Sequence, residues 1–407
     1  MSEAEQKGAE TLTFDAVGLG RGGLNRATST CVPENPMEII NTTQQTITFA
    51  NLGCSTKIPI PILPEAWLQT AGVPWTNYVS RHLAWKRQAL PWLPDEKLQD
   101  TARADLQAMQ LGFPAVDDEA CALGLAACLT IVCYVDSFIE EMEPEMANQC
   151  VKRCLAILDG DILDNRIGKA LSTPFRIVTN YIDEAENPRN SSEKAQTICS
   201  AFYKQMLALF HPKTAVAVIY DMKDMIASQL LELDFKEGIL LIKTYGEYLE
   251  IRNRTFGLMP LLTIAEHYYL AEGDSLAASP DISLLKTQIS LMGVGQNDIG
   301  GLEKDIQLSN PSNSIMVLAT LLGRKPIVSA NSLLESQDIL SLFEKENQRF
   351  INDVVKTWSR IQIRSTRKEE RRLSNTLITL CVTHLKWVLS TSRYNIDDVL
   401  QGDCIGS

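Results

Sequence analysis

The sequence predicts an all-α protein in which one helical domain takes up most of the 407 residues. Hydrophobic residues make up 45% of the chain, which is enough for a sizeable core. Beyond Trp75, apolar residues recur at helical spacing in one segment after another. The pattern contains neither strand–helix alternation nor an internal repeat. We therefore expect a single bundle of helices.

Composition divides the chain into three parts. Residues 1–35 are rich in Gly, Ser, Thr and charge, which predicts a flexible N-terminal extension. Residues 36–75 hold many Pro and β-branched residues, which predicts an extended arm that packs on the domain. Residues 76–407 form the helical domain. Its helices are expected at 95–111, 118–143, 145–158, 194–211, 213–233, 236–256, 258–271, 282–307, 315–323, 331–364 and 370–391.

Stretches that disfavour helix separate these elements. The apolar run at 120–135 begins after acidic residues and continues into "DSFIEE", so it predicts a buried helix rather than a membrane span. Further along the chain, three stretches are expected to end helices: "GDILDN", "DEAENPRNSS" and "AEGDSLAASPD". Toward the C-terminus, "LSNPSNS" and "STRKEERR" have the same effect.

Charge and cysteine content exclude several classes of protein. The net charge of −12 and a pI near 5.0 argue against a binder of nucleic acid or of anionic membranes. The opening residues, "MSEAEQKGAE", lack the hydrophobic centre of a signal peptide. The ten Cys are scattered without Cys-x-x-Cys pairs, which is typical of reduced core residues. We expect a cytoplasmic protein without a membrane span.

Oxygen-bearing side chains recur at helical spacing in two places. Asp136 and Glu140 are at i and i+4 in "YVDSFIEEM", so both carboxylates share one face where the buried helix ends. Asn297, Gly301 and Asp305 are at i, i+4 and i+8 in "NDIGGLEKD". Carboxylate and amide oxygens suit a hard divalent cation such as Mg²⁺. A solvated helix end has the same pattern, so each place alone is a weak indication.

Basic residues accompany both places. Lys304 directly precedes Asp305, and Arg252 and Arg254 interrupt an otherwise apolar helix in "YLEIRNRTFGLMP". Arg393 and Tyr394 stand together after the last long helix. Arg and Tyr bind phosphate oxygens by charge and by hydroxyl donation. Two acidic faces, several cations and a deep apolar core together suit a prenyl diphosphate, whose anionic head needs Mg²⁺ and whose tail is apolar.

These residues resemble the motifs of class I terpene synthases, particularly microbial sesquiterpene cyclases. The aspartate-rich motif D-D-x-x-D/E matches "DSFIE", with Ser137 in place of the second Asp. The motif N-D-x-x-S-x-x-x-E matches "NDIGGLEKD", with Gly301 in place of the hydroxyl residue and Asp305 in place of Glu. The resemblance covers residues from about 75 to 396, and the order and spacing of the motifs are specific. The whole chain also resembles fungal humulene-type cyclases.

The resemblance implies roles for particular residues. Its metal ligands would be Asp136, Glu140, Asn297 and Asp305. The Arg that contacts diphosphate in the family precedes the Asn by 45 residues, which selects Arg252 because 297 − 252 = 45. The catalytic residues that hold the diphosphate would be Arg252, Lys304, Arg393 and Tyr394. Gly301 removes one expected ligand, so water or another group must complete the coordination.

The resemblance also implies a fold and an activity. The fold would be a class I terpenoid synthase bundle of helices around a central apolar active-site cavity. The activity would be that of a sesquiterpene cyclase of secondary metabolism, in which Mg²⁺ promotes ionisation of farnesyl diphosphate and the carbocation cyclises, for example to a humulene-type macrocycle. Three Mg²⁺ ions are expected, with Mn²⁺ as a substitute, and released diphosphate would take the final proton. The expected assembly is a monomer or a homodimer.

Apolar residues near the motifs are candidates for the cavity wall, where an aromatic face can stabilise a carbocation. Each of them is equally suited to ordinary core packing. The candidates are Phe138, Phe256, Leu258, Met259, Leu261, Leu285, Met292 and Trp387.

Two other functions remain open. An isoprenyl diphosphate synthase shares the helical fold, but it needs two full aspartate-rich motifs, and this chain has one incomplete copy. In a non-catalytic helical interaction protein, Asp136, Asn297 and Arg252 would be incidental surface residues. If the chain is a cyclase, Asn297→Ala and Arg252→Ala should abolish turnover with little loss of thermal stability.

Overall fold

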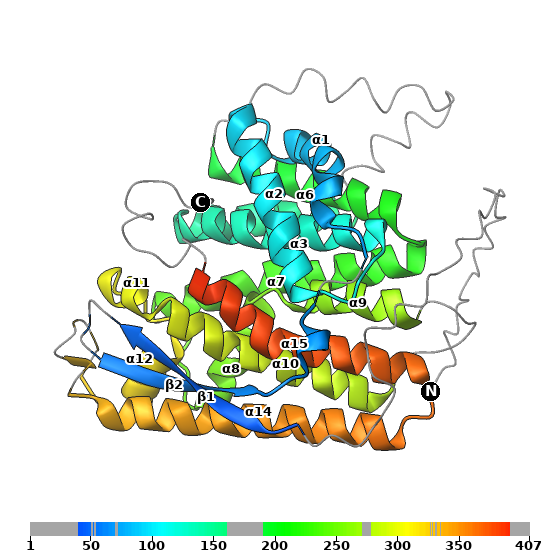
Figure 1. Cartoon of the computed structure of the whole chain (residues 1–407). Helices are drawn as coiled ribbons and strands as arrows, with labels where there is room; N and C mark the ends of the chain where they lie inside the picture. Colours follow the sequence, from blue (N-terminus) through cyan, green and yellow to red (C-terminus); the bar gives the residue numbers. More distant parts are fainter. Residues whose placement is uncertain are drawn as a thin grey trace, which may run out of the picture.

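The computed structural model describes residues 40–390, apart from 50–51, 53, 70–71, 161–189, 271–277, 326, 328, 330–331 and 334. Helices dominate its regular structure, which confirms the all-α prediction (Figure 1). Two short 3-10 helices, Glu65–Trp67 and Trp75–Tyr78, precede the first α-helix. The α-helices are α1 (Val79–Ala89), α2 (Asp95–Gly112), α3 (Glu119–Glu140), α4 (Pro144–Leu158), α6 (Ser191–Leu209), α7 (Pro212–Lys236), α8 (Tyr245–Thr255), α9 (Met259–Leu270), α10 (Pro280–Gly300), α11 (Leu302–Gln307), α12 (Ser314–Leu321), α14 (Gln337–Arg364) and α15 (Lys368–Ser390).

Helix α3 lies at the centre of the larger hydrophobic core. Leu125 and Ile131 are among its fully buried residues, and the helix packs against α2, α6, α7 and α9. Asp118 is its N-cap, whose carboxylate accepts a hydrogen bond from the Cys121 N–H at 2.8 Å. By length and composition α3 could cross a membrane, yet 61% of its most apolar window is buried inside the protein. That burial is typical of a core helix.

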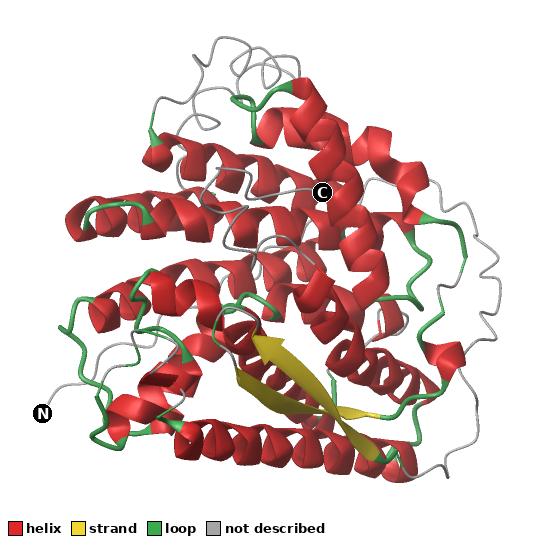
Figure 2. Cartoon of the chain, turned by 60° about the vertical axis from the view of Figure 1, so that its left-hand side comes forward, coloured by secondary structure: helices red, strands yellow, loops and turns green. Residues whose placement is uncertain are grey.

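Two strands of the predicted arm form a hairpin, β1 (Thr42–Phe49) and β2 (Cys54–Pro61). The strands pair antiparallel from Thr42↔Pro61 to Phe49↔Cys54, and Figure 2 shows them lying beside the long helix α14. Glu344 of α14 accepts a hydrogen bond from the Lys57 N–H at 2.8 Å. Apolar hairpin residues belong to a second hydrophobic core that also holds Ile299, Leu302 and Ile306. The hairpin therefore contributes to the packing around the α10–α11 junction.

The prediction of one helix over 282–307 is wrong at its C-terminal end. α10 ends at Gly300, Gly301 lies between the helices, and α11 begins at Leu302. Adjacent glycines weaken a helix because they lose more backbone entropy on ordering than any other residue. The Gly301 N–H still bonds the Asn297 carbonyl at 2.9 Å, and the Asp305 N–H bonds the Gly301 carbonyl at 2.8 Å. Asn297, Gly301 and Asp305 therefore keep the spacing of successive helical turns.

The expected helix over 236–256 is also interrupted. α7 extends to Lys236, and α8 begins only at Tyr245. A capping box fixes that start, because Thr244 accepts from the Glu247 N–H and Glu247 accepts from the Thr244 N–H. Between α8 and α9, Gly257 has φ +73°, and a Cβ there would lie 2.8 Å from Cγ2 of Val132. Glycine is required at this break for both reasons.

Candidate active site

The acidic end of α3 faces the C-terminal end of α7. Glu140 accepts a hydrogen bond from Lys236 Nζ at 2.6 Å, and Asp136 lies one turn earlier on α3. Burial lowers the pKa of Lys236, but the negative charges of Glu232, Glu140 and Asp136 outweigh burial and raise it above its usual value. Asp136 and Glu140 therefore act electrostatically on the same ammonium group.

Alternating charges continue from Lys236 into the protein. Glu232 of α7 lies 3.3 Å from Lys236 Nζ and 3.2 Å from Arg252 Nη1. Arg252 Nη2 donates a hydrogen bond to Asp298 Oδ1 at 2.9 Å. Burial raises the pKa of Glu232, but Arg252 and Lys236 together lower it to about 2. We call Lys236, Glu232, Arg252 and Asp298 the charge network, because it joins the acidic end of α3 to α10.

Asp298 is the most enclosed member of the charge network, with 1% exposure. Besides Arg252, it accepts hydrogen bonds from the Tyr248 hydroxyl at 3.2 Å and from the Ser314 hydroxyl at 2.7 Å. The Ser314 N–H, at the start of α12, donates to the same carboxylate at 2.9 Å. A buried carboxylate with this many donors is well compensated for the loss of water. Asp298 thereby ties α10 to α8 and to α12.

Asn297 lies between two buried anchors. On one side, Asp298 holds α10 against α8 and α12. On the other, Gln296 is fully buried and its amide nitrogen donates to the Cys381 carbonyl of α15 at 2.8 Å. The neighbours on both sides restrict rotation of this helical turn, while Asn297 itself is only partly buried. The buried Gln296 and Asp298 therefore fix the orientation of the helical turn that carries Asn297.

Asp305 is held by two asparagines. Its Oδ1 accepts from Asn310 Nδ2 at 3.1 Å, and its Oδ2 accepts from Asn313 Nδ2 at 2.9 Å. Burial raises the pKa of Asp305 to about 6, with Asp298 adding to the rise, although the hydrogen bond from Asn313 and the charge of Lys304 oppose it. A nearby cation would favour the ionised form of this carboxyl.

Gly301 is in close contact with Asp305. A Cβ at position 301 would lie 3.2 Å from Asp305 Oδ2, which is tighter than most van der Waals contacts of a Cβ. The space in which a serine side chain would begin is thus bordered by the Asp305 carboxylate. Glycine at position 301 therefore leaves room for the carboxylate of Asp305, which is one methylene shorter than the Glu of the family motif.

The predicted basic residues differ in their burial and in their partners. The side chain of Arg252 is 11% exposed and lies in the charge network. Arg254 is directed outward and binds Asp224 at 2.9 and 2.5 Å, with 41% of its side chain exposed. Lys304 is partly buried next to Asp305. Arg393 and Tyr394 lie outside the described residues.

The predicted wall residues separate into two aromatic groups and a set of core residues. Phe256 contacts His384 of α15, with ring centroids 5.4 Å apart. Phe138 contacts Trp92 at 5.9 Å, and Lys194 lies over the Phe138 ring. Met259 is partly buried against the larger core. Trp387 is partly buried and lies 5.7 Å from the His384 ring. The other four candidates are buried, with 7% exposure or less: Leu258, Leu261, Leu285 and Met292.

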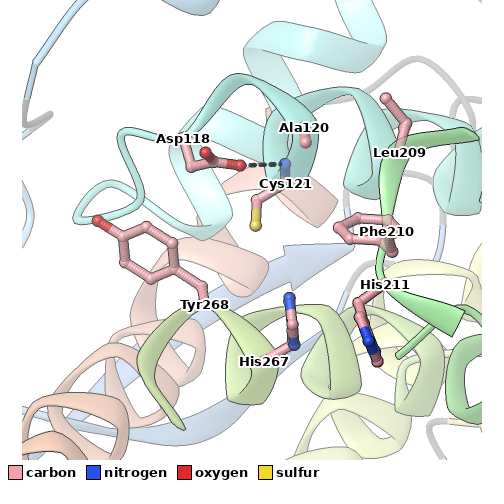
Figure 3. A pocket seen from close by; sticks show the side chains of 8 residues that line it. All are labelled: Asp118, Ala120, Cys121, Leu209, Phe210, His211, His267 and Tyr268. Atoms are coloured by element: carbon pink, nitrogen blue, oxygen red, sulfur yellow. Dashed lines mark hydrogen bonds between the residues drawn. The ribbon is translucent and has the colours of Figure 1, made fainter. Parts of the chain in front are cut away.

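A separate pocket of about 190 Å³ lies at the opposite end of α3 from Asp136 (Figure 3). Its lining includes the N-cap Asp118, and His267 from α9 points toward Cys121. His267 is hydrogen-bonded to Thr214 at 2.6 Å. Because this pocket is at the other end of the helix, it is distinct from the charge network.

The oxygen donors fit Mg²⁺ that is bound together with a diphosphate. Among the described residues, no three His, Cys, Asp or Glu side chains form a cluster able to hold a metal ion. The candidate donors stand in two pairs, Asp136 with Glu140 on α3 and Asn297 with Asp305 at the α10–α11 junction. Mg²⁺ typically uses one or two carboxylates and completes its coordination with water and substrate phosphates.

Sequence reasoning missed several residues of this site. Glu232 and Lys236 are at i and i+4 at the end of α7, a charge pair that could have been recognised from the same rule as Asp136 and Glu140. Asp298 stands next to Asn297 in the quoted motif, so its type and place were visible. No sequence pattern predicts that Asn313 donates a hydrogen bond to Asp305. The two side chains meet only because the chain turns back after α11.

A family model matches the part of the chain that holds most of the candidate site. The family model "Terpene synthase family 2, C-terminal metal binding" matches residues 127–325, which include Asp136, Arg252 and Asn297. A search of curated proteins found no match.

Solved terpene synthases share the fold. The linalool/nerolidol synthase from Streptomyces clavuligerus, in complex with 2-fluorogeranyl diphosphate, has a TM-score of 0.51 and 15% identity over 78% of this chain and 99% of that chain. The 2-methylisoborneol synthase from Streptomyces coelicolor A3(2), in complex with Mg²⁺ and 2-fluoroneryl diphosphate, has a TM-score of 0.55 and 13% identity, over 77% and 91% of the two chains. Residues 127–325 therefore match the metal-binding region of the terpene synthase family model, and the chain shares the α-helical fold of the class I terpene synthases.

Proposed function

We propose that the chain is a Mg²⁺-dependent sesquiterpene cyclase that ionises farnesyl diphosphate. The charge network supports this most directly, because it joins the carboxylate pair of α3 to the Asn297 turn of α10 through Arg252 and Lys236. Such a site combines side chains that can bind cations with side chains that can bind an anion. Phe256 follows Arg252 by one helical turn. The prenyl diphosphate analogues bound to the two neighbours support the same substrate class.

The anionic head of the substrate would meet the polar residues. Asp136, Glu140, Asn297 and Asp305 would hold Mg²⁺, which supplies stabilisation of the negative charge on the leaving diphosphate when bound. Arg252 would donate hydrogen bonds to the diphosphate together with Lys304, Arg393 and Tyr394. Arg252 Nε is buried and has no hydrogen-bond partner within the described part of the chain, so a diphosphate oxygen placed beside it would satisfy this donor.

The apolar tail would meet the aromatic residues beyond Arg252. Contact between a carbocation and an aromatic face such as that of Phe256 contributes ~2 kcal/mol or more when water is excluded. We further propose a humulene-type macrocycle as product, three Mg²⁺ ions with Mn²⁺ as a substitute, and a cytoplasmic monomer or homodimer that works in secondary metabolism. The resemblance of the sequence to class I sesquiterpene cyclases, and to fungal humulene-type cyclases in particular, motivates these details.

Incubation with single substrates tests the proposal. Purified protein is mixed with Mg²⁺ and with geranyl, farnesyl or geranylgeranyl diphosphate, and both volatile products and released diphosphate are measured. We expect a cyclic C15 hydrocarbon or alcohol from farnesyl diphosphate, and its loss on addition of EDTA. Absence of product from all three substrates, with Mg²⁺ or Mn²⁺, would overturn the proposal. A longer prenyl diphosphate on addition of isopentenyl diphosphate would identify a chain elongase instead.

A further inference from the structure

The imidazole of His384 lies beside aromatic rings near the Asn297 turn. It meets the Phe256 ring edge-on, at 5.4 Å between centroids and 88° between planes, and Trp387 lies 5.7 Å away on the same helix. The Phe256 ring in turn fills the space beside Gly293, where a Cβ would lie 2.6 Å from Phe256 Cε1. Gly293 is one turn before Asn297 on α10. His384 therefore lies close to the helical turn that carries Asn297, although its sequence position gave no sign of this.

Hydrogen bonding defines which imidazole nitrogen carries the proton. The Cys381 carbonyl can only accept, so the Gln296 side chain must direct its NH₂ group toward it, at 2.8 Å. The Gln296 Oε1 is then the atom 2.9 Å from His384 Nδ1, and this oxygen can only accept. His384 Nδ1 must therefore be the protonated nitrogen. In the neutral ring, Nε2 then bears the lone pair.

The neutral ring is the favoured form. Burial lowers the pKa of His384 to about 4, so the imidazole is uncharged near neutral pH. Gln296 is itself fully buried, so water does not compete for the hydrogen bonds of the amide that fixes the tautomer. The side chain of His384 is only partly buried, unlike that of Gln296.

We propose that His384 Nε2 is the base that ends the cyclisation, with Gln296 as its positioning residue. This inference rests on the proposed cyclase function. In the step, a C–H bond next to the cationic carbon breaks and its electron pair forms the new C=C bond. The proton passes to His384 Nε2, which becomes an imidazolium and later returns the proton to the released diphosphate or to water. Even a weakly basic imidazole suffices, because such C–H groups are strongly acidic.

Two variants separate the base from the shape of the site. His384→Asn keeps a nitrogen donor that can reach Gln296 but removes the basic nitrogen, and His384→Phe keeps an aromatic ring without any base. His211→Asn is the matched control, because His211 is exposed, accepts from the Lys213 N–H as the N-cap of α7, and Asn serves equally well there. Diphosphate release reports ionisation, and gas chromatography of the volatiles reports how the carbocation is quenched.

We expect His384→Asn or His384→Phe to release diphosphate within about threefold of the wild-type rate, as removal of a group that acts after ionisation should. The share of the wild-type alkene should fall at least tenfold, on the scale of general-base catalysis, with alcohols and other alkenes in its place. An unchanged product profile in a folded, ionising variant would overturn the role of His384 and leave the cyclase proposal intact. Failure of the wild type to release diphosphate would overturn both.

A measurement without turnover tests the tautomer. The chain has four His, so ¹⁵N-histidine labelling gives few imidazole signals, and His384→Asn assigns the one of interest. We expect a neutral ring protonated on Nδ1 at pH 7, and a changed signal pattern in Gln296→Leu. A ring protonated on Nε2, or an imidazolium at pH 7, would overturn the proposal whether or not the variants fold.

Discussion

Arg252 donates a hydrogen bond to Asp298 at 2.9 Å inside the protein, and this pair fixes α8 to α10 beside Asn297. Asp298 also accepts from Tyr248 and Ser314. Replacement of Asp298 by Ala leaves these donors without an acceptor and leaves Arg252 with one carboxylate. We expect the free energy of unfolding, measured by urea denaturation at pH 7, to fall by ~3–5 kcal/mol, because a buried charge loses its partner.

The ion pair of Arg324 with Asp338 provides the control for Asp298. Both side chains are at least half exposed, at 56% and 50%. Exposed pairs contribute little, so Asp338→Ala should cost no more than ~1 kcal/mol. Equal losses in the two variants would show that burial does not strengthen the Arg252–Asp298 pair.

Arg252→Ala and Asn297→Ala should separate stability from turnover. The sequence alone predicts little stability loss for either variant. The structure changes this for Arg252, because its removal leaves Glu232 and Asp298 without their shared cation, at a cost of ~3–5 kcal/mol. Asn297→Ala should lower turnover at least about a hundredfold, as loss of a preorganised contact to the reacting group does. Its unfolding free energy should change by less than ~1 kcal/mol.

The measurement for these two variants is urea denaturation together with diphosphate release. Arg254→Ala is a close control for Arg252, since Arg254 lies two residues away and pairs with Asp224 at the surface. If Arg252→Ala were as stable as Arg254→Ala, the charge network would have no structural role.

Gly301→Ala should weaken the response to Mg²⁺. The new Cβ would stand 3.2 Å from Asp305 Oδ2, so the carboxylate must move by a few tenths of an ångström. The backbone at Gly301 is right-handed, with φ −82°, so alanine itself is not strained there. We expect the Mg²⁺ concentration for half-maximal diphosphate release to rise several-fold, whereas the melting temperature changes little.

Gly246→Ala is the control for Gly301→Ala. Its Cβ would meet only Thr244 Oγ1, at an ordinary 3.8 Å, in the first turn of α8. Its Mg²⁺ response should equal that of the wild type. An unchanged response in Gly301→Ala as well would mean that Asp305 is not a metal ligand or that it yields without cost.

Local sequence pattern predicted most of the helices, because helix formation depends on the spacing of residues within one segment. The helix from Glu119 to Glu140 contains the apolar run 120–135 and has a capping Asp118, so its limits could be predicted within a few residues. The same spacing predicts that Asp136 and Glu140, the candidate metal ligands of α3, lie on one face of that helix. By contrast, the helix break at Gly301 depends on two opposing effects. The two glycines destabilise the helix, whereas the surrounding packing stabilises it, and the spacing of residues does not show which effect is larger.

Long-range partners could not be predicted. Glu232 neutralises Arg252 across 20 residues, and Gln296 orients His384 across 88 residues. Such pairs form where two helices pack against each other in the folded protein. A single sequence does not show which helices pack together. The sequence predicted Arg252 only as a residue that holds diphosphate, and its burial between two carboxylates became visible only in the structure.

Asp105 should make stability depend on pH through a buried cluster far from the candidate active site in sequence. Its Oδ2 accepts from Lys86 Nζ at 2.6 Å, from His82 Nε2 at 3.1 Å and from the Thr130 hydroxyl at 2.8 Å. Burial raises the pKa of Asp105, but Lys86 and His82 outweigh it and lower the pKa from 3.8 to about 2. A carboxyl with a lowered folded-state pKa stabilises the protein above the unfolded value. That contribution is lost as the pH falls from about 4 toward 2.

Urea denaturation of the wild type and of Asp105→Asn between pH 7 and pH 3 measures this contribution. We expect the wild type to be more stable at pH 5–7, and the difference to shrink by ~1 kcal/mol by pH 3, about half of the ~2–3 kcal/mol that full protonation of Asp105 would remove. Asp95→Asn serves as the control, because Asp95 binds Arg87 at 2.7 Å on an exposed surface where solvent screens the pair. A difference between wild type and Asp105→Asn that stays constant down to pH 3 would show that the Asp105 carboxyl is not held ionised by Lys86 and His82.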